Sequence, residues 1–183
     1  YSYSGNKFAA LQSYLRIEEI SEKPSGSLLN DIAVLYKYDF NDTIKSIEIH
    51  SKNIEINPNY SNAYSQRGRD YLDLKKYEKA KNDFDKRVEI DSTYYYAYSA
   101  RSNYFKETED FVNAEADLTK AIELILKEKD NYYGETIAEL FIDRAAVLMK
   151  QEKFLEAIDD WKSTFEYDIE YKPYAHLIIG DIY

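Results

Sequence analysis

The 183-residue chain contains no cysteine and little glycine or proline, with 5 and 3 residues respectively. The absence of cysteine excludes disulfide bonds, thiolate metal ligands and a cysteine nucleophile. A β-sandwich or β-barrel needs turn residues about every ten positions, so the scarcity of glycine and proline argues against both. It favours long helices joined by short connections. No apolar run reaches the roughly 20 residues that span a bilayer, so we expect no direct membrane insertion.

Positive charge is also scarce. The chain has 24 Lys and Arg against 34 Asp and Glu, which gives a formal net charge of −10. An acidic chain repels the phosphate backbone and anionic lipid surfaces, so we expect no nucleic-acid partner. Hydrophobic residues make up 44% of the sequence, which is enough for a packed core.

The sequence repeats itself with a period of 34 residues. Residues 62–84 (NAYSQRGRDYLDLKKYEKAKNDF) align with 96–118 (YAYSARSNYFKETEDFVNAEADL), and a third copy follows 43 residues later at 139–161. Within the first copy, Tyr64, Gly68 and Tyr71 recur at helical spacing, as do Tyr77, Ala80 and Phe84. The intervening DLKK breaks this phase, as a tight turn between two helices would. Each copy is therefore predicted to be a helical hairpin.

This pattern resembles the tetratricopeptide repeat (TPR) family. The order is a bulky aromatic residue, a small residue, an aromatic residue, then A-x-x-x-F, which this chain supplies as Tyr64, Gly68, Tyr71, Ala80 and Phe84. The resemblance is strong over 61–167 and weaker over 25–60, where Ser46 and His50 replace the alanine and the aromatic residue. It implies an all-α, TPR-like α-solenoid of stacked antiparallel helical hairpins with a right-handed superhelix.

The repeat register divides the chain into six segments. The nine extra residues around 126–134 are expected to extend the second helix of one repeat and to lengthen its loop, and we expect the whole array to belong to a longer protein. The segments are 1–24 (a partial repeat, second helix), 25–60 (a degenerate repeat), 61–94, 95–137 (the repeat with the extended second helix and loop), 138–172, and 173–183 (the start of a further repeat or a capping helix).

An arginine is followed sixteen residues later by an aspartate in each of the three strong repeats. The arginine lies on the core stripe of the first helix, where an unpaired charge is costly. We therefore predict structural ion pairs between the two helices; the alternative is a row of ligand-binding arginines. The pairs are Arg67 with Asp83, Arg101 with Asp117, and Arg144 with Asp160.

The sequence lacks the common motifs for catalysis, metals and cofactors. It has no phosphate-binding glycine loop and no H-E-x-x-H motif. His50 and His176 are far apart and have no acidic partner at ligand spacing. The segment 39–44 begins like a calcium loop, but Ile44 replaces the required glycine. We expect no enzyme activity, metal or cofactor within these residues.

The TPR resemblance implies recognition of a protein or peptide in a groove lined by the first helices of the repeats. Groove-facing positions follow from the family geometry. They are Asn62, Ser65, Arg69, Tyr96, Ser99, Asn103, Lys106, Ile142 and Met149. The TPR domains that clamp the C-terminal carboxylate of heat-shock chaperones carry Lys and Asn at set positions, which in this chain hold Ser65, Arg69, Ala100, Glu139 and Asp143. Two acids beside one base would repel a carboxylate, so this specialisation is not expected.

Two alternatives remain open at the level of sequence. One is a small-ligand or glycan-binding module that uses exposed aromatic residues. The tyrosine-rich stretch 91–105 is mostly core in our interpretation, with Tyr98 and Phe105 on core positions, while Tyr96 lies off the stripe and is the candidate contact. The other is a targeting region of an enzyme whose catalytic domain lies elsewhere. The sequence contains no apolar segment of the signal-peptide type and does not identify a compartment; our default expectation is the cytoplasm.

Overall fold

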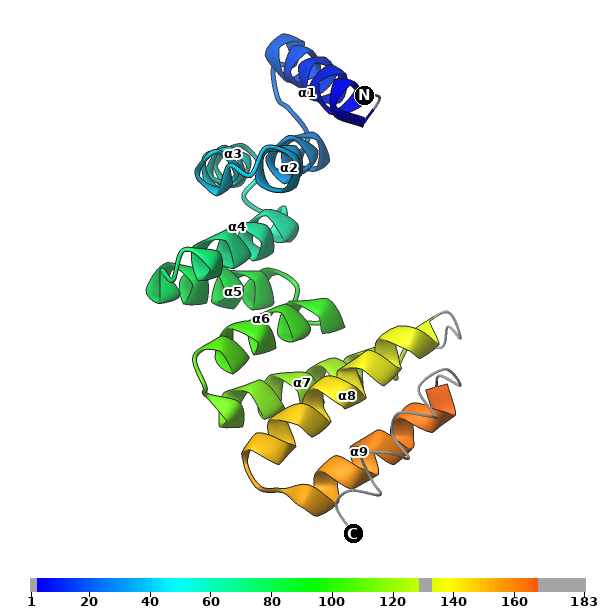
Figure 1. The fold of residues 1–183 in the computed structure, drawn as a ribbon. Helices are drawn as coiled ribbons and strands as arrows, with labels where there is room; N and C mark the ends of the chain where they lie inside the picture. Colours follow the sequence, from blue (N-terminus) through cyan, green and yellow to red (C-terminus); the bar gives the residue numbers. More distant parts are fainter. Residues whose placement is uncertain (1–2, 129–132, 168–183) are drawn as a thin grey trace. The chain divides into compact units, whose positions relative to one another are not determined.

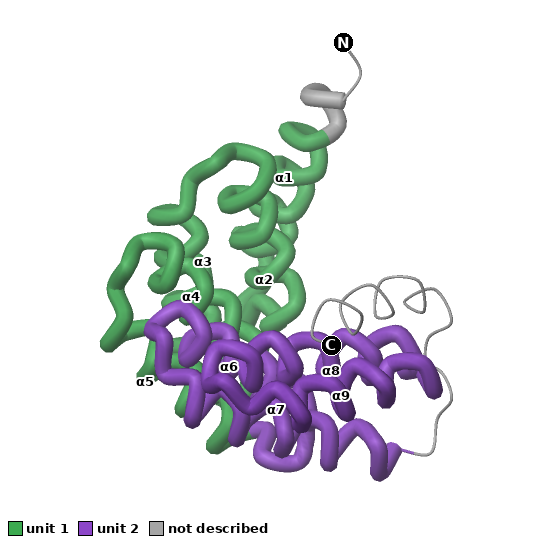
Figure 2. Tube along the Cα trace, turned by 60° about the horizontal axis from the view of Figure 1, so that its bottom comes forward, with its two compact units in different colours: residues 1–90 green, residues 91–183 purple. Residues whose placement is uncertain are grey.

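The computed structural model describes residues 3–128 and 133–167, and within these ranges all of its regular secondary structure is helical. The chain divides into two compact units, residues 1–90 and 91–183 (Figure 2). The described helices of unit 1 are α1 (Tyr3–Ile20), α2 (Gly26–Val34), the π-helix η1 (Leu35–Asp39), α3 (Thr43–Ile56), α4 (Ser61–Asp73) and α5 (Tyr77–Ile90). Those of unit 2 are α6 (Tyr95–Glu107), α7 (Phe111–Ile125), α8 (Gly134–Lys150) and α9 (Phe154–Tyr167) (Figure 1).

Within each unit, every helix packs against the next helix in the chain. In unit 1 the contacts run from α1 to α2, α3, α4 and α5, and in unit 2 from α6 to α7, α8 and α9. Leu11, Leu29 and Ile32 form the buried centre of one core cluster in unit 1. A cluster in unit 2 joins α8 and α9 and includes Leu148 and Trp161. Sequential packing is what a helical repeat requires, because a lone hairpin cannot bury its apolar face.

The two helices of each hairpin are separated by the same turn. Lys75, Glu109 and Glu152 occupy corresponding positions and have φ angles of 54°, 57° and 60°. The next N–H reaches back to the carbonyl five residues earlier, as in Lys76 N to Tyr71 O at 2.8 Å. This geometry is a Schellman C-cap, whose left-handed residue is usually glycine. The sequence marks these turns weakly because none of the three residues is glycine.

The degenerate hairpin differs by one residue in its first helix. Its left-handed residue is Asn41 (φ 54°), but the following N–H, that of Asp42, bonds to Tyr36 O, six residues earlier. The π-helix η1 accommodates the additional residue, as π-bulges generally do. Equivalent positions before this point therefore lie 35 residues apart in this repeat and the next, so buried Leu29 corresponds to Tyr64. This shift accounts for the weak sequence resemblance of α2 and η1, whereas Ser46 and His50 lie in α3, where the spacing of 34 holds.

The expected extension of the second helix in the 95–137 segment is wrong. Helix α7 ends at Ile125 and has 15 residues, compared with 14 in α5. The additional length lies in the longer connection to α8 and in α8 itself, which has 17 residues compared with 13 in α6. Gly134, the first residue of α8, lies so close to α9 that a Cβ would come within 2.7 Å of Tyr167 O. A glycine at this position therefore permits the close contact between the start of α8 and the end of α9.

The tyrosine-rich stretch contributes largely to packing. Tyr95 and Tyr104 are each 8% exposed and Phe105 is 9% exposed, whereas Tyr94 is 41% exposed. Tyr98 is half-buried, and its hydroxyl donates to Ser92 O at 3.1 Å. In the preceding repeat Tyr64 makes the corresponding bond to Pro58 O at 3.2 Å. These phenols fasten the first helix to the connection before it.

The C-terminal segment predicted to start a further repeat or to form a capping helix, 173–183, lies outside the described residues, as does His176. The repeat boundaries stay predictions. Across the described ranges, no helix is both long and apolar enough to cross a membrane.

Candidate functional site

Each predicted Arg–Asp pair is a two-pronged contact between the helices of one hairpin. Arg67 donates through Nε and Nη2 to Asp83 at 2.8 and 2.7 Å. Arg101 does the same to Asp117 at 2.8 and 2.8 Å, and Arg144 to Asp160 at 2.7 and 2.6 Å. Paired N–H donors match the two carboxylate oxygens, which fixes the orientation of both side chains.

Two of these guanidinium groups also bond to the preceding hairpin. Arg67 Nη1 donates to Ser51 Oγ of α3, and Arg144 Nη1 donates to Thr119 Oγ1 of α7, each at 3.1 Å. Ser51 and Thr119 lie on the second helix of the preceding hairpin, so these contacts join neighbouring repeats. Arg144 also lies 5.5 Å from the ring centroid of Phe141. The arginines act within the fold, which supports the structural interpretation over a ligand-binding row.

Burial sets the electrostatics of the first pair. Burial raises the pKa of Asp83, and the bonds from Arg67 offset only part of that effect. Burial also disfavours the Arg67 charge, but the bonds to Asp83 outweigh it and raise the pKa of Arg67. Removing one partner would leave the other charge buried without compensation, which is the costly case.

A second polar cluster, which the sequence did not reveal, lies inside the degenerate hairpin and α4. Lys37 Nζ of η1 lies 2.6 Å from Asp70 Oδ1 and 2.8 Å from Asp73 Oδ2. Ser46 Oγ of α3 donates to Asp70 Oδ2 at 2.7 Å. Burial raises the pKa of Asp70, against the influence of Lys37 and Ser46. Burial also disfavours the Lys37 charge, but its bonds to Asp70 and Asp73 outweigh this and raise the pKa of Lys37.

His50 belongs to the same buried stripe of α3. Its side chain is 1% exposed, and Nδ1 has no hydrogen-bond partner among the described residues. Burial, together with the positive charges of Lys37 and Arg67, lowers the pKa of His50 to about 4. The histidine is therefore neutral at pH 7. It occupies the place that Phe84, Leu118 and Trp161 hold in the other hairpins, so it serves as a core residue.

The groove positions of unit 1 are less open than their spacing suggested. Ser65 is 0% exposed, so the expectation that it faces a ligand is wrong. It belongs to the buried residues of α4, beside Tyr64 and Gly68. Asn62 donates to Asn30 Oδ1 at 3.1 Å and accepts from Arg87 Nη1 at 3.3 Å, so it links helices. Arg69 is half-buried and keeps part of its side chain at the surface.

The predicted groove positions of unit 2 are all half-buried. Tyr96 is held by ring contacts with Tyr94 and Tyr95, at centroid distances of 6.2 and 6.4 Å. Asn103 donates to Ser99 O at 3.2 Å within α6. Lys106 pairs with Asp143 of α8 at 2.8 Å. These residues share a polar strip along the first helices of the unit.

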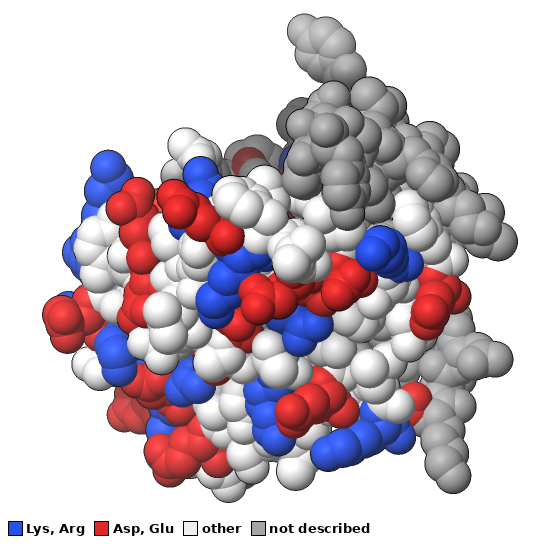
Figure 3. Space-filling model, turned by 90° about the horizontal axis from the view of Figure 1, so that it is seen from below, with Lys and Arg blue, Asp and Glu red and all other residues white. Residues whose placement is uncertain are grey.

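Two further predicted groove positions lie on α8, which is the first helix of the α8–α9 hairpin. Ile142 is half-buried, and Met149 packs against the core of α8 and α9. Acidic and basic side chains are interspersed on the face that Figure 3 shows.

The described part of the chain provides no metal centre: no group of three or more His, Cys, Asp or Glu side chains there could hold an ion. In the segment that begins like a calcium loop, Asp42 instead caps α3 by accepting from Lys45 N at 2.8 Å.

Comparison with known proteins supports the fold and adds little at the level of sequence. No family model and no curated protein matches the chain. Solved structures do match, among them BtubC from P. vanneervenii, at TM-score 0.77 and 15% identity over 89% of this chain and 73% of that one. Residues 41 to the end of MamA from Desulfovibrio magneticus RS-1 match at 0.70 and 15%, over 89% and 86%.

A third structure is described as that of YrrB, a TPR protein with an unusual peptide-binding site. It matches at TM-score 0.66 and 18% identity, over 86% of this chain and 76% of that one. BtubC, MamA and YrrB are all TPR-type proteins. The chain therefore has a TPR-like fold, an all-α solenoid of helical hairpins.

Proposed function

We propose that the chain is a non-catalytic scaffold that binds a protein or an extended peptide along the first helices of its repeats. The observation that carries the proposal is the TPR-like fold, shared with a protein whose described site binds peptides. The polar strip of α6 supports it, because Asn103 and Lys106 combine partial exposure with fixed orientation. Preorganised side chains reduce the entropy cost of binding.

The internal use of the strong charges supports a scaffold over an enzyme. The three aspartates of the ion pairs are each 5% exposed and bonded to arginine. The buried Asp70 is bonded to Lys37 and Ser46. A catalytic acid or base must reach a substrate, and these carboxylates face the protein interior.

A comparative pull-down tests the proposal. The bait is the intact chain, set against a first-helix variant carrying Arg69→Ala, Tyr96→Ala and Asn103→Ala. The matched control carries Glu78→Ala, Val112→Ala and Lys120→Ala, which are changes on second helices. We expect the first-helix variant to lose partners that the control retains, as quantified by mass spectrometry, with circular dichroism confirming that both fold. Equal recovery of partners by both variants would refute binding along the first helices.

A small-ligand or glycan site at Tyr96 is the second candidate, favoured by its contact with the 41%-exposed Tyr94. Aromatic rings of this kind can stack on sugars. Tyr96→Ala separates the two proposals. Loss of sugar binding with intact partner capture would favour the glycan site, whereas loss of partner capture alone would favour the scaffold.

A further inference from the structure

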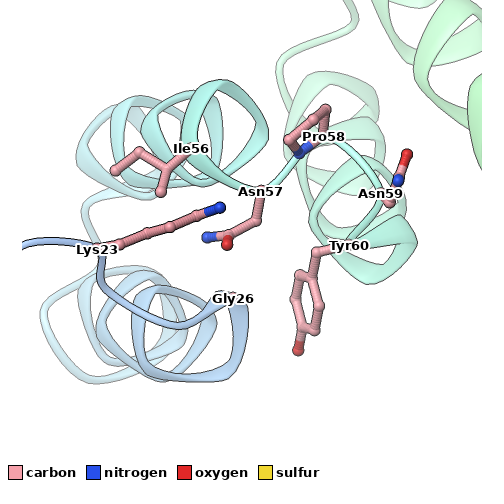
Figure 4. A pocket seen from close by; sticks show the side chains of 7 residues that line it. All are labelled: Lys23, Gly26, Ile56, Asn57, Pro58, Asn59 and Tyr60. Carbon is pink, nitrogen blue, oxygen red and sulfur yellow. The ribbon is translucent and has the colours of Figure 1, made fainter.

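A pocket in unit 1 lies where the α1–α2 connection meets the end of α3 and the start of α4 (Figure 4). Its volume is about 440 Å³, toward the lower end of the roughly 300–1,000 Å³ typical of ligand pockets. It is open to solvent rather than enclosed, so a chain segment can enter and leave it. The lining includes Lys23, Gly26, Ile56, Asn57, Pro58 and Tyr60.

Hydrogen bonds from α3 hold one wall of this pocket in place. Asn53, which is 0% exposed, donates to Gly26 O at 2.7 Å. Asn57 donates to Pro24 O at 3.1 Å and to Asn53 Oδ1 at 3.1 Å. The backbone at Pro24 and Gly26, directly after Lys23, is therefore held against the end of α3.

The opposite wall depends on a glycine. A Cβ at position 26 would lie 2.5 Å from Tyr60 Cγ, so only glycine lets the ring lie against the start of α2. Figure 4 shows the Tyr60 side chain extending beside Gly26. Ile56 and Pro58 add apolar surface nearby. The pocket thus offers an aromatic and aliphatic side for an apolar group.

The electrostatics of the pocket oppose those of the chain. Lys23 is the only charged residue among the described residues that line it, although the chain carries a net charge of −10. The Lys23 side chain is exposed and extends across the space between α2 and α3 (Figure 4). The starts of α2 and α4 border the pocket and add partial positive charge, while the end of α3 at Ile56 adds partial negative charge, so the full charge of Lys23 decides the sign. An anionic group is the complementary ligand.

The features that build the pocket are particular to this repeat. At the places of Gly26, Asn53 and Asn57, the next repeat has Ser61, Arg87 and Asp91. Repeat packing alone would not require this combination, since the other hairpins form without it. The convergence of a glycine, two amides and a lysine on one open pocket therefore points to a ligand.

We propose that this pocket binds an acidic side chain of a partner protein segment. The carboxylate pairs with Lys23, and an adjacent apolar residue packs against Tyr60 and Ile56. An internal side chain is favoured over a chain end because the pocket is open, so the segment can continue on both sides. The pocket lies at the connections between helices rather than on the first-helix strip. It adds a second contact to the proposed scaffold and can fail without affecting that function.

Nuclear magnetic resonance of the ¹⁵N-labelled full chain tests this proposal. The probes are the capped peptides acetyl-Gly-Glu-Leu-Gly-amide and acetyl-Gly-Gln-Leu-Gly-amide. We expect saturable shifts at residues 23–26 and 56–60 with the glutamate peptide, and roughly tenfold weaker binding of the glutamine peptide, because the charge-assisted bond is lost. Equal binding of both peptides, or shifts confined to other residues, would overturn the proposal.

Variants locate the effect. Lys23→Gln is expected to weaken the glutamate peptide about tenfold, and Lys23→Arg to retain binding. Lys45→Gln, which removes another lysine of unit 1, is the matched control and should bind normally. If Lys23→Gln bound the glutamate peptide with unchanged affinity, Lys23 would not be the group that pairs with the carboxylate. If acetyl-Gly-Leu with a free C-terminus bound more tightly than the glutamate peptide, the pocket would prefer a chain end, and the proposal of an internal acidic side chain would be overturned.

Discussion

Arg101 and Asp117 are joined across the α6–α7 hairpin by two parallel hydrogen bonds, each 2.8 Å long. The same interface in the degenerate hairpin is apolar, because Ile32 and Ile49 take the corresponding places and belong to one core cluster. At equivalent positions between paired helices, the chain therefore uses an Arg–Asp ion pair in one hairpin and an apolar Ile–Ile pair in another. Buried ion pairs and well-packed apolar pairs can be close in stability, whereas half of a pair is costly.

Replacing Asp117 by asparagine tests this relationship. The change leaves the Arg101 guanidinium partly buried without its counter-charge, so we expect a loss of about 2 kcal/mol in the free energy of unfolding. For a chain of this size that corresponds to a fall of roughly 4–8 °C in Tm. Thermal and urea unfolding followed by circular dichroism measure it.

The matched control is Arg101→Ile combined with Asp117→Ile, which copies the degenerate hairpin. It should recover most of the stability lost in Asp117→Asn. The account would be contradicted if the double variant lost as much unfolding free energy as Arg101→Ile and Asp117→Ile lose in total when measured separately. An unchanged Tm in Asp117→Asn would also contradict it.

Glu109 is held in the left-handed backbone region, with φ of 57°. This conformation costs a side-chain-bearing residue about 1 kcal/mol, although glycine also gains entropy in the unfolded chain. Glu109→Gly should therefore stabilise the fold by about 0.5 kcal/mol. Lys120→Gly, inside α7, should destabilise it by about 1 kcal/mol. Urea unfolding of both variants checks the opposite signs; two losses would contradict the role assigned to the turn.

The first turn of α5 lacks a cap that α3 and α7 possess. Asp42 and Asp110 accept hydrogen bonds from Lys45 N and Asn113 N, at 2.8 and 3.2 Å. Lys76 occupies the same position before α5, and its side chain has no acceptor. Lys76→Asp should raise the unfolding free energy by about 1 kcal/mol. Lys76→Ala removes the lysine without adding an acceptor, and an equal gain there would rule out capping as the cause.

Stability should depend on pH through His50. Its pKa is about 4 in the folded chain, below its ordinary value of 6.5. The folded state therefore favours the neutral form, so this contribution is present above pH 6.5 and is lost as the pH falls toward 4. A shift of this size corresponds to about 3 kcal/mol. Unfolding measured across this range checks the expected decline.

Substitution of His50 separates its contribution to the pH dependence of stability from that of the buried carboxylates. The pKa values of Asp70 and Asp83 are raised, so they act in the opposite direction at low pH, and His50→Leu leaves both in place. We expect this variant, which copies Leu118 two repeats further along the chain, to lose the decline between pH 6.5 and 4. His176→Gln should keep it. A decline of the same size in His50→Leu would disprove the assignment.

The hairpins of 61–167 were predictable because aromatic and small residues recur at a constant spacing. The degenerate hairpin was harder, because the π-helix adds a residue and Leu29 replaces the first aromatic of the pattern. Its polar cluster gave no signal, since Lys37 and Asp70 are 33 residues apart and only the packing of η1 on α4 joins them. The burial of Ser65 depends in the same way on neighbouring helices rather than on its own spacing.

Site-specific photo-crosslinking tests the central proposal most directly. A benzoylphenylalanine at position 69 or 103, on first helices, is compared with one at position 112, where Val112 is 69% exposed on a second helix. Accessibility alone would favour position 112. We predict that the captured partner crosslinks from 69 and 103 and not from 112. Crosslinking from 112, with none from 69 or 103, would contradict recognition through the first helices.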